Sequence, residues 1–156
     1  MKTIISKALA LLAVAAGLLS FSSSGPQGHA GGEGFEILIN GKTVLQQYGG
    51  DMNKVNVLQL EKTSPTDKIT FRYYHCGRVS KNRTVTIKDG NDNTLKVFRF
   101  TDVPAPVADM SCSMQDLMTL QKNSHTSLKI YYSSSALPKG RQLVSVVFGN
   151  NNKAMP

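Results

Sequence analysis

The chain has no tryptophan, two cysteines and three histidines among its 156 residues, and aromatic residues make up 7% of it. The missing tryptophan and the spacing of the two cysteines argue against a true immunoglobulin domain. The sequence contains no Gly-rich phosphate-binding loop, which argues against nucleotide chemistry of the P-loop kind. Beyond residue 19 no apolar run approaches the roughly 20 residues that cross a bilayer, so we expect a soluble mature protein with no transmembrane segment.

The first thirty residues have the pattern of a secretory signal peptide. Lys2 and Lys7 precede the apolar stretch ALALLAVAAGLL at residues 8–19. This stretch is too short to span a membrane but is typical of a signal sequence. Small residues follow it, with candidate cleavage points between residues 22 and 30. We therefore expect an exported protein, periplasmic or extracellular, with residues 1–30 as signal peptide and short leader; an uncleaved anchor helix is the alternative.

Acidic residues are fewer than basic ones, and this imbalance gives the mature chain a positive net charge. Removal of Lys2 and Lys7 reduces the 18 basic residues to 16, against ten acidic residues, and leaves a net charge of +6. A basic surface favours anionic partners: envelope phosphates, an anionic polysaccharide or an acidic protein surface. No nucleic acid partner is expected, because the aromatic residues form no base-stacking motif.

Two segments carry the period-two alternation of β-strands. Phe35–Tyr48 contains Asn40-Gly41 between two β-rich runs, which predicts a hairpin with a two-residue type I′ turn. In that register Ile37 faces Val44. The core side of this hairpin would hold Phe35, Ile37, Ile39 and Val44. In the second segment, Lys68–Cys76, the alternation places Ile69, Phe71, Tyr73 and His75 on one side.

The whole pattern predicts one domain over residues 31–149 that is mainly β, followed by a polar tail at 150–156. Further strands are expected at 55–60, 84–88, 94–100, 127–133 and 142–148, with a turn at 137–140. One short α-helix is expected at 113–122, with Ser113 and Asp116 as a capping box. About eight strands favour an antiparallel β-sandwich, immunoglobulin-like or jelly-roll-like; a barrel is the alternative.

Cys76 and Cys112 permit one intrachain pairing, and export favours its oxidation, so we predict a disulfide between them. A metal site is the alternative interpretation. Thiolate, thioether and imidazole together suit Cu(I). The candidate copper ligands are His75, Cys76, Met110, Cys112 and Met114. A disulfide would consume both thiolates, and the methionines also fit ordinary core positions.

A basic loop and two outward tyrosines are the candidate binding residues. Arg78, Lys81 and Arg83 fall within six residues. Tyr74 and Tyr131 each belong to a tyrosine pair, in which neighbouring side chains point to opposite faces of a strand. Exposed tyrosines suit sugars or protein partners. The alternative is a solvated rim with ordinary cross-strand pairs.

Catalytic chemistry has little support in the sequence. Beyond residue 30 the histidines are His75 and His125, and neither belongs to a recognisable Ser/His/Asp or Cys/His arrangement. The acidic residues do not single out a facing pair of carboxylates of the glycosidase kind. We therefore expect a non-catalytic binding or structural module of the bacterial envelope that needs no cofactor; an extracytoplasmic copper-binding protein is the alternative.

Overall fold

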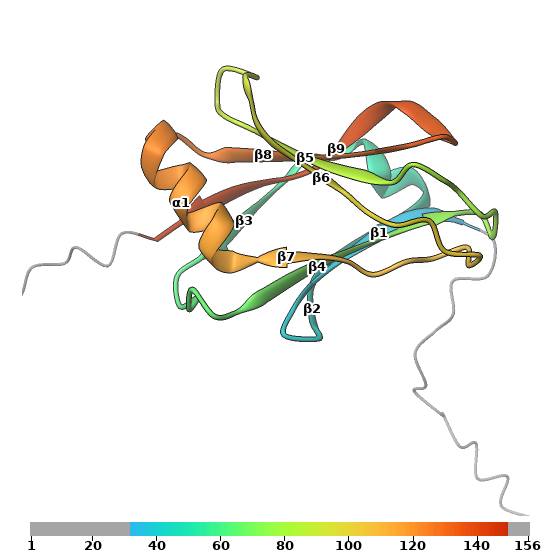
Figure 1. The fold of residues 1–156 in the computed structure, drawn as a ribbon, viewed down its shortest axis with the longest axis horizontal. Coiled ribbons are helices and arrows are strands. Elements are labelled where there is room, and N and C mark those ends of the chain that lie inside the picture. The colour runs from blue at the N-terminus through green and yellow to red at the C-terminus, as the bar shows by residue number, and fades with distance from the viewer. Residues whose placement is uncertain (1–31, 150–156) are drawn as a thin grey trace, which may run out of the picture.

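Two β-sheets lie face to face in the computed structural model, which describes residues 32–149 (Figure 1). Sheet A has the strand order β2-β1-β4-β7, and sheet B has the order β3-β9-β8-β5-β6. The strands of sheet A are β1 (Glu33–Ile39), β2 (Lys42–Tyr48), β4 (Lys68–His75) and β7 (Met110–Ser113). Those of sheet B are β3 (Asn56–Leu60), β5 (Thr84–Lys88), β6 (Thr94–Arg99), β8 (Leu128–Ser134) and β9 (Leu137–Phe148).

This two-sheet arrangement confirms the predicted mainly-β fold, with nine strands in the described part where about eight were expected. One pair is parallel rather than antiparallel, because β3 lies alongside β9 in the same direction. A short 3-10 helix, η1 (Gly49–Asn53), connects β2 to β3. The predicted signal peptide and the polar tail lie outside the described residues.

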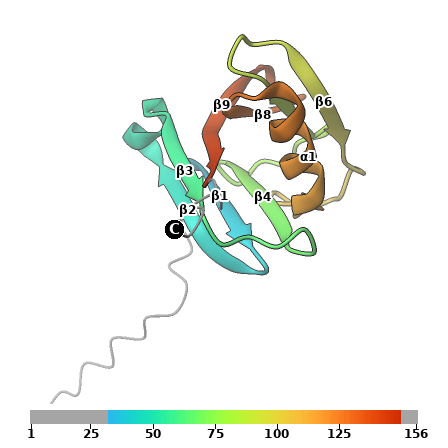
Figure 2. The same cartoon turned by 90° about the vertical axis from the view of Figure 1, so that its left-hand side faces the viewer.

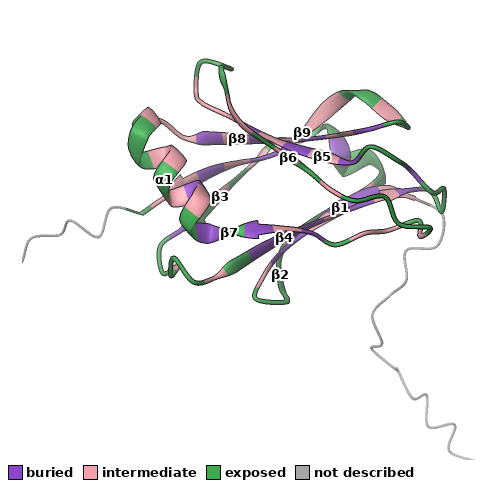
Figure 3. Ribbon diagram, viewed as in Figure 1, coloured by how far each residue is buried: buried purple, intermediate pink, exposed green. Residues whose placement is uncertain are grey.

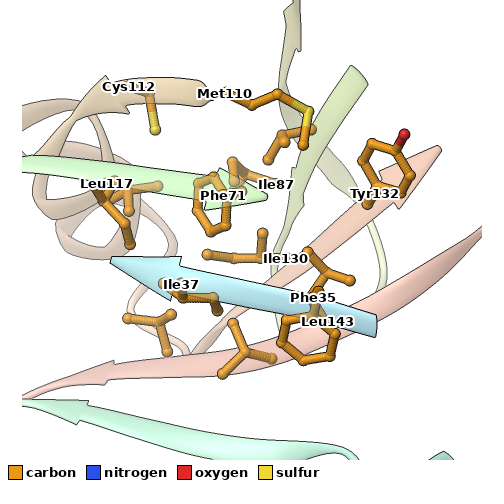
Figure 4. Close-up of a cluster of buried hydrophobic side chains, with 14 of the residues drawn as sticks. Phe35, Ile37, Phe71, Ile87, Met110, Cys112, Leu117, Ile130, Tyr132 and Leu143 are labelled. Carbon is orange, nitrogen blue, oxygen red and sulfur yellow. The ribbon is translucent and has the colours of Figure 1, made fainter. Parts of the chain in front are cut away.

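The core lies between the sheets and is formed by alternate residues of the central strands. In β4 the buried residues include Ile69, Phe71, Tyr73 and His75, as the alternation predicts. In β8 Leu128, Ile130, Tyr132 and Ser134 point inward in the same way. Figure 3 shows the buried segments facing each other across the two layers. Figure 4 shows the core side chains, with Leu117 and Cys112 toward one end and Tyr132 toward the other.

The predicted hairpin between β1 and β2 forms, but its register differs from the expected one. Asn40 and Gly41 have φ values of 49° and 81°, as a type I′ turn requires. A β-bulge between Ile37 and Leu38 then shifts the pairing, so Ile37 lies opposite Leu45. Because a shift of one residue exchanges the two faces of a strand, Val44 is exposed and does not join the core.

The segment before the helix is a strand, not the first turn of the helix. Met110–Ser113 forms β7 and pairs with β4, and α1 (Met114–Ser124) starts directly after it. The Ser113 hydroxyl caps the helix by accepting a bond from the Gln115 N–H at 3.1 Å. Asp116 does not complete a capping box, because its carboxylate pairs with Lys96 at 2.7 Å. The helix crosses from sheet A to sheet B and covers one end of the sandwich (Figure 2).

The turn between β8 and β9 also lies elsewhere than predicted. Ser134 pairs with Leu137, so the chain reverses at Ser135 and Ala136. The predicted turn at residues 137–140 instead forms the beginning of the long strand β9, where the register is irregular. Gly140 adopts a positive φ of 69° there, a conformation that favours glycine.

Candidate binding site

Tyr131 lies in the middle strand of sheet B and points away from the core, as the alternation in β8 predicts. Beside it the outer surface has a hollow of about 150 Å³ between β5, β8 and the irregular start of β9. The lining residues are Thr86, Lys88, Tyr131, Tyr132, Ser133, Pro138, Lys139 and Gly140. Sheet pairing brings them together, because Thr86 lies opposite Tyr131 and Thr84 lies opposite Ser133.

Polar contacts hold the Tyr131 side chain in place. Its hydroxyl donates to Gln142 at 3.0 Å and approaches the Asp92 carboxylate at 3.4 Å. The ammonium group of Lys88 lies 4.6 Å from the centre of the Tyr131 ring, a cation–π contact. Partial burial and the negative charge of Asp92 raise the pKa of Tyr131, so the phenol is neutral at pH 7.

Neither lysine at this hollow forms an ion pair within the described part of the chain. Among the described residues, the ion pairs leave out both Lys88 and Lys139, and the lining contains no Asp or Glu. Asp92 is nearby, but it pairs with Lys129 at 2.9 Å. The two lysines and the hydroxyls of Thr86 and Ser133 therefore form a site that suits an anionic, hydroxyl-bearing group.

Two larger surface hollows lack this excess of charge. One of about 360 Å³ lies beside Cys112 and contains one acid and one base, Asp67 and Lys68. Asp67 already accepts from Asn40 and from the Ser64 N–H. The other, of about 410 Å³, is lined by Thr43–Gln46 of the edge strand β2 and has no charged lining residue. The first therefore has a single lysine with an aspartate next to it in the chain, and the second has no charged group at all.

Tyr74 cannot contribute to the Tyr131 site, because it lies on the outer face of the opposite sheet. Its ring centre is 5.7 Å from that of Tyr48, and the Tyr48 hydroxyl donates to Glu36 at 2.6 Å. Burial and the Glu36 carboxylate raise the pKa of Tyr74. Arg72 approaches Glu36 at 3.6 Å and pairs with Asp109 at 2.6 Å. Charges on this face therefore satisfy one another.

The predicted basic loop divides into two parts. Arg78 and Lys81 are exposed in the loop between β4 and β5, as expected for surface contacts. Arg83 is only 1% exposed, so the prediction that it binds partners at the surface is wrong. It directly precedes Val85 and Ile87 in the inward alternation of β5, which places its side chain on the core side.

The predicted disulfide does not form: Cys76 is free and exposed, and Cys112 is free and buried. Cys112 lies opposite Ile69 in the β4–β7 pairing, and Ile69 is seven residues before Cys76 in the chain. At about 3.3 Å per residue along β4 this separates the cysteines by about 23 Å. A disulfide needs Cα atoms within about 7 Å, so the sheet register excludes the pairing.

The same register separates the candidate copper ligands. Met110 lies opposite Phe71, four residues before His75, which corresponds to about 13 Å along the strand. Met110 and Met114 are fully buried in the core, and no group of three or more His, Cys, Asp or Glu residues converges in the described chain. The structure therefore does not assemble the sulfur and imidazole ligands that the copper interpretation requires.

A buried polar cluster, which the sequence analysis did not identify, lies at the end of the core opposite α1. His75 is 3% exposed, and its Nε2 lies 2.9 Å from the Tyr132 hydroxyl and 3.2 Å from the Ser134 hydroxyl. The rings of Tyr73 and Tyr132 stack at 4.4 Å, and the Tyr73 hydroxyl donates to Glu33 at 2.6 Å. We call Tyr73, His75, Arg83, Tyr132 and Ser134 the polar end cluster.

Burial sets the protonation of this cluster. It lowers the pKa of His75, and the charges of Arg83 and Arg78 lower it further against the opposite effect of Glu33. It also raises the pKa of Tyr132. Both groups are thus neutral at pH 7. The Ser134–His75 pair resembles part of a nucleophilic site, but both side chains are buried and use each other and Tyr132 as partners, which suits a structural role.

Comparison with known proteins adds no family assignment. No protein-family model matches the chain, and no curated protein matches it significantly. Within the described residues no helix has the length and apolar character needed to cross a membrane.

Proposed function

We propose that this protein is an exported, non-catalytic module that binds an acidic polysaccharide of the bacterial envelope through the Tyr131 hollow. The observation that carries this proposal is the pair Lys88 and Lys139, which line the hollow without an ion-pair partner among the described residues. The signal-like N-terminus and the net charge of +6 expected after its removal support an extracytoplasmic, anionic partner.

The hydroxyl groups around the lysines favour a sugar over a compact inorganic anion. Thr86 and Ser133 line the hollow, and Ser133 shares a 2.6 Å hydrogen bond with Thr84. Hydroxyls both donate and accept, which suits the O–H groups of a sugar ring. The lysines then supply the charge that distinguishes an acidic chain from a neutral one.

Affinity electrophoresis through gels containing polygalacturonate tests the proposal, with neutral dextran as the reference polymer. We expect retardation by polygalacturonate alone, weakening as salt rises. The double variant Lys88→Gln/Lys139→Gln should weaken binding about tenfold, because two partly exposed ion pairs would be lost.

A matched control separates the site from overall charge. Lys62 and Lys122 are exposed outside the hollow, so Lys62→Gln/Lys122→Gln removes the same charge elsewhere. Equal weakening by both double variants would contradict the Tyr131 hollow as the site. Absence of retardation of the wild-type protein at low salt would contradict recognition of a carboxylated polysaccharide altogether.

A further inference from the structure

Arg99 is an exposed arginine at the end of β6, the edge strand of sheet B. Within residues 32–149 it forms no ion pair. Asp102, the acid that follows it in the chain, accepts instead from the Asn82 N–H at 2.7 Å. The guanidinium of Arg99 is therefore open to a ligand, as are the ammonium groups of Lys88 and Lys139 in the Tyr131 hollow.

The strand register places Arg99 on the same face of sheet B as this hollow. Arg99 lies opposite Thr84 in the β5–β6 pair, and Thr84 lies opposite Ser133 in the β5–β8 pair. Residues that are directly opposite in antiparallel strands have their side chains on one face. The Thr84 and Ser133 hydroxyls are 2.6 Å apart, and Ser133 lines the hollow. The Arg99 side chain therefore shares the outer face of the sheet with them.

These residues form one row across four strands, with a cation at each end. At the β9 end the backbone approaches β8 closely, since a Cβ at Gly140 would lie 3.4 Å from the Ser133 Cβ. Lys139 precedes Gly140 and lines the hollow at that end. The row crosses the three gaps between β6, β5, β8 and β9, which corresponds to about 14 Å from backbone to backbone. We call Arg99, Thr84, Ser133 and Lys139 the cross-strand row.

A second row lies beside the first, two residues along each strand and about 7 Å away. Thr86 lies opposite Val97 on one side and opposite Tyr131 on the other, so all three share the outer face. Val97 is 40% exposed. A sugar ring has apolar C–H faces as well as hydroxyls, and apolar and aromatic side chains suit those faces. The two rows together therefore match a ligand that carries carboxylates, hydroxyls and apolar ring faces.

We infer that the binding site extends from the Tyr131 hollow to Arg99, so that one acidic sugar chain lies across β9, β8, β5 and β6. Lys139 and Arg99 contact carboxylates of different sugar units, and the hydroxyls between them contact the chain. This inference rests on the proposed polysaccharide binding and specifies its ligand. The ligand is a chain of several acidic units and not a single acidic sugar, because one sugar ring is much shorter than the cross-strand row.

Galacturonate oligomers of increasing length measure how far the site extends, in NMR titrations of the mature protein at low salt. Hexagalacturonate should shift the amide signals of the hollow and of Val97 and Arg99, and monogalacturonate those of the hollow only. Arg99→Gln should bind the monomer as the wild type does but the hexamer about threefold more weakly, because one exposed ion pair is lost. Lys122→Gln is the control, since it removes one exposed positive charge on α1, outside sheet B.

The possible results separate this inference from the proposed function. Hexamer shifts confined to the hollow would overturn the inference, and so would equal weakening of monomer and hexamer by Arg99→Gln. Equal effects of Arg99→Gln and Lys122→Gln would also overturn it, because they would reflect overall charge. In each of these cases the wild-type protein still binds, and the Tyr131 hollow stands as the site. Absence of wild-type binding to every oligomer and to polygalacturonate would instead contradict the proposed function, and this inference with it.

Discussion

The two ends of the core differ in chemistry although the same strands build both. At the end covered by α1, the side chains of Ile69, Met114, Leu117 and Leu128 are fully buried and apolar. At the other end the same strands β4 and β8 finish with His75 and Ser134, which join Tyr73, Tyr132 and Arg83 in the polar end cluster. The first end is held by apolar area, and the second by hydrogen bonds and ring stacking.

This difference shows where stability and specificity reside. Apolar burial contributes in proportion to area and tolerates changes of shape. A buried polar group contributes little when it is satisfied but is unfavourable when one partner is missing, so it fixes one arrangement of the two sheets. The His75–Tyr132–Ser134 contacts join sheet A to sheet B in this way.

The two cysteines give the largest measurable contrast between the ends. Cys76 is exposed beyond His75, and Cys112 is buried near α1, where burial raises the pKa of its thiol to about 12. The native protein should therefore react with iodoacetamide at Cys76, and at Cys112 only after unfolding. Because unfolding from a typical stability is rare, we expect Cys112 to react at least ~1000-fold more slowly.

Mass spectrometry of the labelled protein measures both rates, and the variants Cys76→Ser and Cys112→Ser assign them. After air oxidation we expect dimers linked through Cys76 and no internal bridge. A Cys76–Cys112 disulfide in the oxidised, folded protein would show that the register of β4 and β7 is wrong.

The next prediction tests the apolar end. Leu117→Ala should lower the free energy of unfolding by about 2–5 kcal/mol, because it leaves a cavity between α1 and the sheets. Urea unfolding measures this change. Leu120→Ala is the matched control on the same helix, since Leu120 is only partly buried and should cost less. Equal losses in the two variants would mean that α1 does not present Leu117 to the core.

The parts of the fold that sequence predicted are those in which one local rule decides the outcome. Alternation identified the inward face of β4, and Asn40-Gly41 identified the turn between β1 and β2. The β-bulge after Ile37 was not predicted, because one extra residue in the pairing of two strands has no distinct signature in the sequence. Strand β7 was not predicted, because four residues are too few to show a periodic pattern. Residues 137–140 look like a turn, yet the irregular pairing lets Pro138 lie within a strand without donating a hydrogen bond.

Only the part of the candidate site that depends on a local pattern was predicted from the sequence. The outward direction of Tyr131 followed from alternation, but Lys88 and Lys139 join it only through the pairing of distant strands. Arg83 was assigned to the surface because of its charge, although its spacing from Val85 and Ile87 indicates the inward face. In this strand the period-two alternation predicts the buried side correctly, and the charge of Arg83 does not. A charged residue at an inward position of the alternation therefore indicates a buried polar group here.

The smallest expected effect is a pH dependence of the free energy of unfolding, and it arises from His75 at the polar end of the core. Burial lowers the pKa of His75 in the folded state below its ordinary value of 6.5. The folded state therefore prefers the neutral imidazole, so its contribution is complete above pH 6.5 and is lost as the pH falls toward the folded pKa. A single proton changes stability by at most about 1.4 kcal/mol per pH unit.

Urea unfolding between pH 7.5 and pH 5 measures this slope, in a range above the ordinary pKa of the aspartates. The wild-type protein should lose stability across the range, and His75→Gln should be less stable at pH 7.5 but flatter with pH. His125→Gln, which alters an exposed histidine, should keep the wild-type slope. Retention of that slope by His75→Gln would contradict the prediction, and a steeper loss of stability in the variant than in the wild type would mean that the imidazole is charged in the folded protein. Glu33, which counters the effect of burial, would then be its partner, and the polar end would be held by an ion pair rather than by neutral hydrogen bonds.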